Sequence, residues 1–112
     1  MKMSFIALLP LATALVLLAQ QTMPRMTTVE PATGKVGDVL AVAGENLDKD
    51  QVKEVYLTVG STDVKVEITE QAGAAIKFKI PEKAASGRYS LMILTAGKEP
   101  KLIEQPVKIT VE

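Results

Sequence analysis

Apolar and polar residues alternate along most of the chain after residue 26. The clearest example is residues 64–68, VKVEI, in which every second residue is apolar and the residues between them are charged. A period of two is typical of a β-strand with one face buried and the other in water. The pattern predicts seven such strands, near residues 27–30, 38–43, 53–59, 63–69, 75–80, 88–95 and 106–111.

Glycine, proline and serine separate these runs at positions that suit turns and bulges. No window after residue 19 carries a convincing helical stripe. Seven short strands at this spacing favour an all-β fold, an antiparallel sandwich of two sheets. We expect these side chains to fill its core: Val29, Leu40, Val42, Leu47, Val55, Leu57, Val66, Ile76, Phe78, Ile80, Tyr89, Leu91, Ile93, Val107 and Ile109.

The N-terminal residues follow a different pattern. Lys2 precedes an apolar-rich run at 5–19 that carries no charge and contains Pro10. Such a run is typical of a secretory signal peptide, whereas a membrane-spanning helix needs about 20 apolar residues. We therefore expect a helical signal peptide at 1–19, with cleavage before Gln20 as the first interpretation and a retained N-terminal anchor as the alternative.

The domain boundaries follow from this interpretation. A flexible leader is expected at 20–26 and a single folded domain at 27–112. The protein is then exported, to the periplasm, the cell surface or the medium, and touches a membrane only through its signal segment.

Charge and composition exclude several functions. Lysine plus arginine and aspartate plus glutamate number 13 each, and the basic residues are scattered, so the basic face of a nucleic-acid-binding protein is missing. The chain has no cysteine and no histidine, so it forms no disulfide and lacks the commonest general base and the thiol nucleophile. Ser61, Ser86 and Ser90 lie outside any nucleophile-elbow motif. We expect no catalytic residue and no cofactor.

A metal site is also not expected. Transition metals lack their preferred ligands in this sequence. Glu45, Asn46, Asp48 and Asp50 offer oxygen atoms to calcium in one loop, but their spacing fits no recognised calcium-loop motif. A solvated turn is the better interpretation of this acidic cluster.

Within residues 36–47, two glycines bracket a short run of small apolar residues. Gly37 is expected to let the chain turn sharply into a strand. Gly44 is expected to adopt a backbone conformation closed to residues with a side chain, and to end that strand. Leu47 would then fold back over the open end of the sandwich.

Three segments together resemble an IPT/TIG domain, the immunoglobulin-like module of plexins, certain transcription factors and many bacterial surface proteins. They are Pro31-x-x-Gly34-x-x-Gly37-Asp38-x-Leu40-x-Val42-x-Gly44-x-Asn46-Leu47, Ile76-x-Phe78-x-Ile80-Pro81 and Ala84-x-x-Gly87-x-Tyr89-x-Leu91-x-Ile93. The resemblance covers residues 27–112 and implies an immunoglobulin-like sandwich without the inter-sheet disulfide. Tyr89 would be either a tyrosine corner or a plain core tyrosine.

A candidate binding patch follows from the alternation. If Val55 and Leu57 point inward, Tyr56 points outward, and Met92 and Leu94 point outward by the same argument. In an immunoglobulin-like topology the third, sixth and seventh strands share a sheet, so these three side chains become neighbours on its outer face. Such a cluster is typical of an interaction surface, although single exposed apolar residues are common.

The sequence therefore favours a non-catalytic, exported module that binds a protein partner or docks within an envelope or surface assembly. The alternative is a carbohydrate- or polymer-binding module of the same fold. Sugar binding favours exposed aromatic rings, and after the signal the chain has three aromatic residues, of which Tyr56 alone is predicted to face water. The partner is thus expected to be protein rather than polysaccharide.

Overall fold

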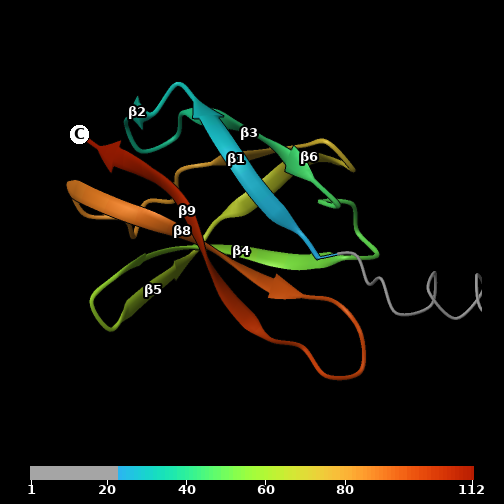
Figure 1. Ribbon diagram of the computed structural model, residues 1–112. Helices are drawn as coiled ribbons and strands as arrows, with labels where there is room; N and C mark the ends of the chain where they lie inside the picture. The colour runs from blue at the N-terminus through green and yellow to red at the C-terminus, as the bar shows by residue number, and fades with distance from the viewer. Residues whose placement is uncertain (1–22) are drawn as a thin grey trace, which may run out of the picture.

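The computed structural model describes residues 23–112, so the predicted signal peptide and residues 20–22 lie outside the described residues. The described chain forms strands and turns, and it has no helix long and apolar enough to cross a membrane. Its strands are β1 (Arg25–Glu30), β2 (Thr33–Gly34), β3 (Val39–Glu45), β4 (Val52–Val59), β5 (Thr62–Lys65), β6 (Glu67–Ala72), β7 (Ala75–Lys79), β8 (Gly87–Thr95) and β9 (Leu102–Val111), as Figure 1 shows.

These strands form two sheets (Figure 1). A four-stranded sheet has the order β1-β3-β7-β6, and a five-stranded sheet has the order β2-β9-β8-β4-β5. All neighbours are antiparallel except β2, which runs parallel to the end of β9. The predicted all-β, immunoglobulin-like sandwich is confirmed. The third, sixth and seventh predicted strands correspond to β4, β8 and β9, and they share a sheet as expected.

The prediction of a single strand at 63–69 is wrong. The chain forms β5 in one sheet and β6 in the other, with Val66 between them. Val66 is buried, and its N–H donates to the Val55 carbonyl at 3.0 Å. Since the period of two continues through this crossing, the alternation alone does not reveal that the segment changes sheets.

The core lies between the two sheets. Every predicted core side chain is buried except Val29, which is partly exposed and packs against the core. Sequence reasoning missed four side chains of the hydrophobic core: Met26, Val52, Ala84 and Val111. Met26 was expected in a flexible leader, but β1 begins at Arg25 because the Met26 side chain inserts fully into the core.

Tyr89 combines a buried ring with a polar contact. Its hydroxyl donates to the Ala85 carbonyl at 2.8 Å, four residues upstream in the chain. This hydrogen bond is the arrangement of a tyrosine corner, so the first of the two interpretations of Tyr89 holds.

The two glycines of the opening strand have different roles. Gly37 has a φ of +93°, which suits the turn predicted there. The prediction for Gly44 was wrong, because Gly44 has no positive φ and β3 continues to Glu45. Gly44 is required by close approach instead, since a Cβ at this position would lie 2.1 Å from the Arg25 carbonyl oxygen in β1. At the end of this strand the backbone takes the left-handed conformation at Asn46 instead, with a φ of +57°, just before the buried Leu47.

A glutamine joins the two sheets. Among the described residues, Gln105 is the one buried polar side chain. Its Oε1 accepts a hydrogen bond of 2.7 Å from the Met26 backbone N–H, and its Nε2 donates to the Ile103 carbonyl at 3.3 Å. The start of β1 is thereby fixed to β9 of the opposite sheet.

A Gly44→Ala substitution tests the close approach of β1 and β3. The new methyl group meets backbone atoms, which cannot move aside as a side chain would, so β1 must shift away from β3. We expect a loss of about 1–3 kcal/mol in the free energy of unfolding, measured by urea denaturation. Gly73→Ala is the matched control, because nothing lies within 4 Å of a Cβ there. Equal stability of the two variants would contradict this account.

Candidate functional site

The predicted patch residues lie together on the outer face of the five-stranded sheet. Tyr56 of β4 pairs directly with Met92 of β8, and Leu94 pairs with Glu54 of β4 on one side and Leu102 of β9 on the other. Tyr56, Met92 and Leu94 are partly exposed, whereas Leu102 is 55% exposed. We call Tyr56, Met92, Leu94 and Leu102 the sheet patch. Its adjacency follows the prediction, and its role in binding stays a prediction.

Leu102 is the residue that sequence reasoning missed. The last strand was expected to begin at 106, whereas β9 begins at Leu102 and forms a long hairpin with β8. The register shifts between Ser90 and Met92, so β9 contains an irregularity between Glu104 and Lys108, although burial still alternates along the whole strand. An apolar Leu-Ile pair after Lys101 was the available signal for an earlier strand start.

Tyr56 is held in place by its neighbours on the same face. Its hydroxyl donates a hydrogen bond to Glu54, and Lys65 Nζ lies 3.0 Å from Glu54 Oε2. The Tyr56 hydroxyl, followed by Lys65, lowers the pKa of the Glu54 carboxyl, and the same hydrogen bond raises the pKa of Tyr56. At neutral pH Glu54, beside the sheet patch, is therefore ionised, and Tyr56 is neutral with its hydroxyl bonded to that carboxylate.

Polar residues surround the apolar centre. Glu104 pairs with Met92, and Lys108 pairs with Ser90 one step further along the same face. On β4 the outward-facing Thr58 donates to Asp63 of β5 at 2.7 Å. An apolar centre with a charged and polar rim is the usual anatomy of a protein–protein interface.

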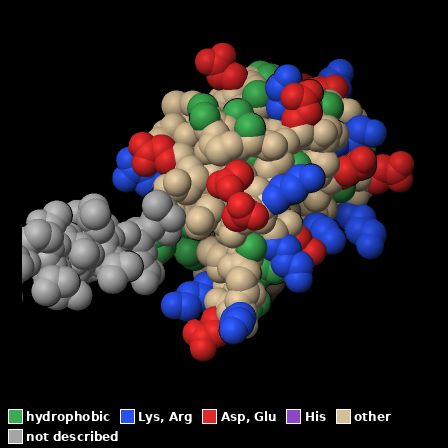
Figure 2. All heavy atoms as spheres, turned by 90° about the vertical axis from the view of Figure 1, so that its right-hand side faces the viewer, with side chains coloured by type: hydrophobic (Ala, Val, Ile, Leu, Met, Phe, Trp, Pro, Cys, Tyr) green, Lys and Arg blue, Asp and Glu red, His purple; other side chains and the backbone are tan. Residues whose placement is uncertain are grey.

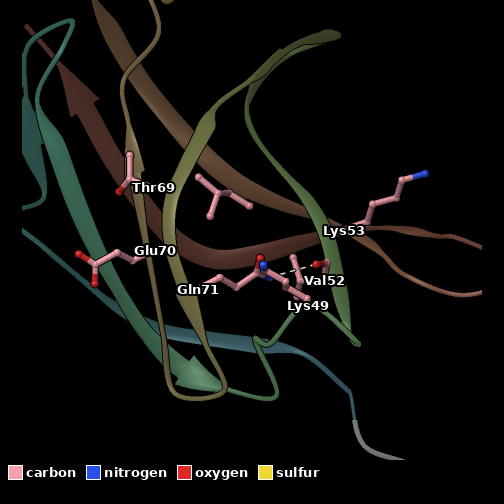
Figure 3. Close-up of a pocket in the computed structure, with 7 residues that line it drawn as sticks. Lys49, Val52, Lys53, Thr69, Glu70 and Gln71 are labelled. Carbon is pink, nitrogen blue, oxygen red and sulfur yellow. Dashed lines mark hydrogen bonds between the residues drawn. The ribbon is translucent and has the colours of Figure 1, made fainter.

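A groove of about 540 Å³ lies between β4 and β6, at the side of the sandwich (Figure 3). Gln71 points across it, and its Nε2 donates to the carbonyls of Leu47 at 2.8 Å and Val52 at 3.0 Å. Figure 3 shows that Lys53 extends away from Gln71 and that Glu70 lies on the other side of β6. The labelled polar groups do not converge on one point in this view, and the two hydrogen bonds of Gln71 join β6 to the backbone at Leu47 and Val52.

A second hollow, of about 460 Å³, lies where the chain enters the fold. One wall consists of residues 23–25 and another of residues 103–106, with Glu45 and Asn46 between them in the lining. Asn46 Nδ2 donates to the Met23 carbonyl at 3.1 Å, which holds the first wall in place. We call this hollow the entry pocket.

The acidic loop after β3 forms a turn. The backbone N–H groups of Gln51 and Val52 both donate to the Asp48 carbonyl at 2.9 Å. Across residues 23–112, no group of three or more carboxylate side chains is placed to hold a metal ion. On the face shown in Figure 2, basic and acidic side chains are interspersed, and neither sign forms a continuous area.

These features define an immunoglobulin-like β-sandwich whose best-formed candidate site is a surface on one sheet rather than a catalytic cleft. The family model described as the IPT/TIG domain matches residues 24–111. The chain therefore belongs to the IPT/TIG family.

Several solved structures share the fold. A protein of unknown function from Bacteroides thetaiotaomicron has a TM-score of 0.68 and 17% identity, covering 82% of this chain and 22% of that one. An auxiliary nutrient binding protein from Bacteroides ovatus has a TM-score of 0.57 and 19% identity, and the match covers 82% of this chain and 21% of that one. A third structure is the SGBP-B protein of a Bacteroides ovatus mixed-linkage glucan utilization locus, in complex with a mixed-linkage heptasaccharide. It has a TM-score of 0.57 and 16% identity, and the match covers 82% of this chain and 24% of that one.

The chain thus spans less than a quarter of the length of each of these structures. At these identities the similarity shows a shared fold. No curated protein is significantly similar to the chain in sequence.

The Tyr56–Glu54 hydrogen bond gives a testable pH dependence. Because the pKa of Glu54 is lowered in the folded protein, its contribution to stability is present above the ordinary glutamate pKa and is lost as the pH falls through the lowered value. NMR titration of the Glu54 side-chain carboxyl should show a pKa below the ordinary value, and a Tyr56→Phe substitution should raise it. An unchanged Glu54 pKa in the variant would show that the hydroxyl does not stabilise the carboxylate.

Proposed function

We propose that this domain is a non-catalytic, exported module that binds a protein partner, or docks within an envelope or surface assembly, through the sheet patch. The observation that carries the proposal is the contiguity of Tyr56, Met92, Leu94 and Leu102 on one sheet face, surrounded by charged residues. Membership of the IPT/TIG family is compatible with this function, but a fold shared by many functions does not by itself select one.

The chemistry of the sheet patch suits a protein partner. Tyrosine and methionine are enriched at the cores of protein interfaces, and a tyrosine brings a large contact area with few rotatable bonds. The hydrogen bond to Glu54 already restricts the Tyr56 ring, so less conformational entropy is lost on binding. The exposed Leu102 adds apolar area at the hairpin end of the patch.

Two further observations support export without catalysis. The sequence has no histidine or cysteine, and the polar side chains of the groove between β4 and β6 do not converge. The run at 5–19 is typical of a secretory signal, and the nutrient-binding proteins that share the fold are consistent with a function outside the cytoplasm.

Glycan binding is the second candidate, favoured by the oligosaccharide complex of one protein with the same fold. Sugar rings stack on exposed aromatic side chains. Among the aromatic residues of the described chain, Phe78 is 0% and Tyr89 is 5% exposed, so Tyr56 is the one ring available, and its hydroxyl is bonded to Glu54. A single restricted ring supports the protein partner over the glycan.

An affinity capture tests the proposal. Tagged protein would be returned to the envelope fraction of its host, cross-linked and analysed by mass spectrometry. We expect an enriched protein whose recovery falls about tenfold or more in the variant Tyr56→Ser, Met92→Thr, Leu94→Thr, because these residues form the apolar centre.

Val39→Thr is the matched control, since Val39 is a 46% exposed apolar residue on the opposite sheet. Its capture should equal that of the unmodified protein. Equal recovery by the triple variant would remove the sheet patch as the binding surface. Retention on insoluble polysaccharide, with no enriched protein, would favour the glycan candidate instead.

A further inference from the structure

We propose that the first half of β9 is a docking edge for an extended segment of the protein partner. The segment would pair with the backbone at Leu102 and Glu104, place a basic side chain opposite Glu104 and direct apolar side chains into the entry pocket. This inference deepens the proposed function, and it rests on it in taking the partner to be a protein.

The backbone of β9 directs hydrogen-bonding groups toward this edge, where they pair with no described strand. The Thr95 N–H donates to the Lys101 carbonyl at 2.9 Å, so residue 101 faces β8. In an antiparallel ladder, alternate residues face the same neighbour, so Ile103 also faces β8. The N–H and C=O groups of Leu102 and Glu104 therefore point away from β8.

Among residues 23–112, no strand pairs with that side of β9 before its end, and β1 packs beside β9 without forming a ladder with it. β2 lies on this side, but its pairing is limited to Thr110 and Val111 of β9. The N–H groups of Thr110 and Glu112 donate to the carbonyls of Ala32 and Gly34, both at 2.9 Å. The corresponding groups of Leu102 and Glu104 pair with no described strand, which leaves a template for strand addition.

The other sheet edges are protected against strand addition. β2 has two residues and β5 has four, and both are too short to offer a long ladder. β1 is irregular between Met26 and Thr28, and β6 is irregular between Ile68 and Glu70. Short strands and bulges are the usual devices that prevent edge-to-edge pairing. The ladder from Leu102 to Glu104 is regular, because the β9 irregularity comes after Glu104.

The entry pocket lies beside this edge and gives the segment its specificity. Side chains on an added strand alternate between two faces. A residue opposite Glu104 would share the outer face with the sheet patch, whereas its two neighbours would lie on the same side as Ile103 and Gln105. Ile103 and Gln105 line the entry pocket together with Met23 and Pro24, so apolar neighbours are favoured.

The charge of Glu104 selects the partner's chemistry. Among the described residues, ion pairs join Lys65 to Glu54 and Lys77 to Glu70, and Glu104 has none. Glu104 is exposed on the outer face, opposite Met92. A second copy of this chain, paired antiparallel about Glu104, would bring two carboxylates together, which is unfavourable. A segment with a lysine or arginine at this position fits better than self-pairing.

A synthetic peptide provides the test. The probe is acetyl-Thr-Leu-Val-Lys-Val-Leu-Thr-amide, whose apolar residues flank a central lysine symmetrically, and the comparison peptide has glutamate in place of lysine. Amide chemical shifts and hydrogen exchange are measured by NMR on isotope-labelled protein. We expect the lysine peptide to slow exchange at the Leu102 and Glu104 amides, and to bind roughly fivefold more tightly than the glutamate peptide.

A Glu104→Lys variant should reverse this preference, so that the glutamate peptide binds more tightly. Glu82→Lys is the matched control, because Glu82 is an exposed glutamate outside β9. This variant should still bind the lysine peptide more tightly than the glutamate peptide. The proposal is overturned if millimolar lysine peptide leaves the Leu102 and Glu104 amides unchanged, if both peptides bind equally, or if the protected amides belong to another edge.

The patch variant Tyr56→Ser, Met92→Thr, Leu94→Thr separates this proposal from the proposed function. It retains Leu102 and Glu104, so its edge should still bind the lysine peptide. Peptide binding without capture of any protein would mean that the proposed function fails while the edge stands. Capture through the sheet patch without peptide binding would overturn the proposed docking edge and leave the proposed function standing.

Discussion

Packing between the inner faces of the two sheets is the interaction on which the structure depends. The chain has no cysteine, so side-chain burial must hold the sheets together where many immunoglobulin-like domains also use a disulfide. Leu91, Phe78 and Ile93 are fully buried in this layer. Because side chains alternate along each strand, burying one face fixes which residues face outward on the other. The candidate surface is therefore a direct consequence of the core.

Two polar side chains complete this packing at the margins of the sandwich. Gln105 joins the start of β1 to β9, and Gln71 joins β6 to the carbonyls of Leu47 and Val52. Gln105 is buried and Gln71 is partly buried, and an amide left without partners in such a position would cost free energy, so each side chain holds its neighbouring backbone in one arrangement. Gln105 also borders the entry pocket, which links the stability of the fold to the shape of the proposed docking edge.

The alternation of apolar residues is a strong predictor of which side chains are buried and a weak predictor of where strands begin, end or change sheet. The crossing at Val66 kept the period of two and was invisible in the sequence. Gly44 was recognised as a required glycine, but the requirement is the approach of β1, a contact between segments far apart in the chain. Such contacts depend on register between strands, which the pattern of a single strand does not contain.

The candidate site, too, could be predicted from the sequence only in part. The adjacency of Tyr56, Met92 and Leu94 could be predicted, because it needs only the alternation and an immunoglobulin-like strand order. The contribution of Leu102 and the open edge at Glu104 could not, because they depend on the early start of β9 and on the shortness of β2. The proposed function depends on these surface details rather than on the fold, because a fold shared by many functions does not by itself select one.

The most direct test of the account is site-specific photo-cross-linking in the native host. A photoreactive phenylalanine derivative would replace Met92 at the centre of the sheet patch or, for comparison, Val39 on the outer face of the opposite sheet. The account predicts a discrete cross-linked protein from position 92 and none from position 39. No product from position 92, or the same product from both positions, would contradict the claim that the outer face of the five-stranded sheet is the binding surface.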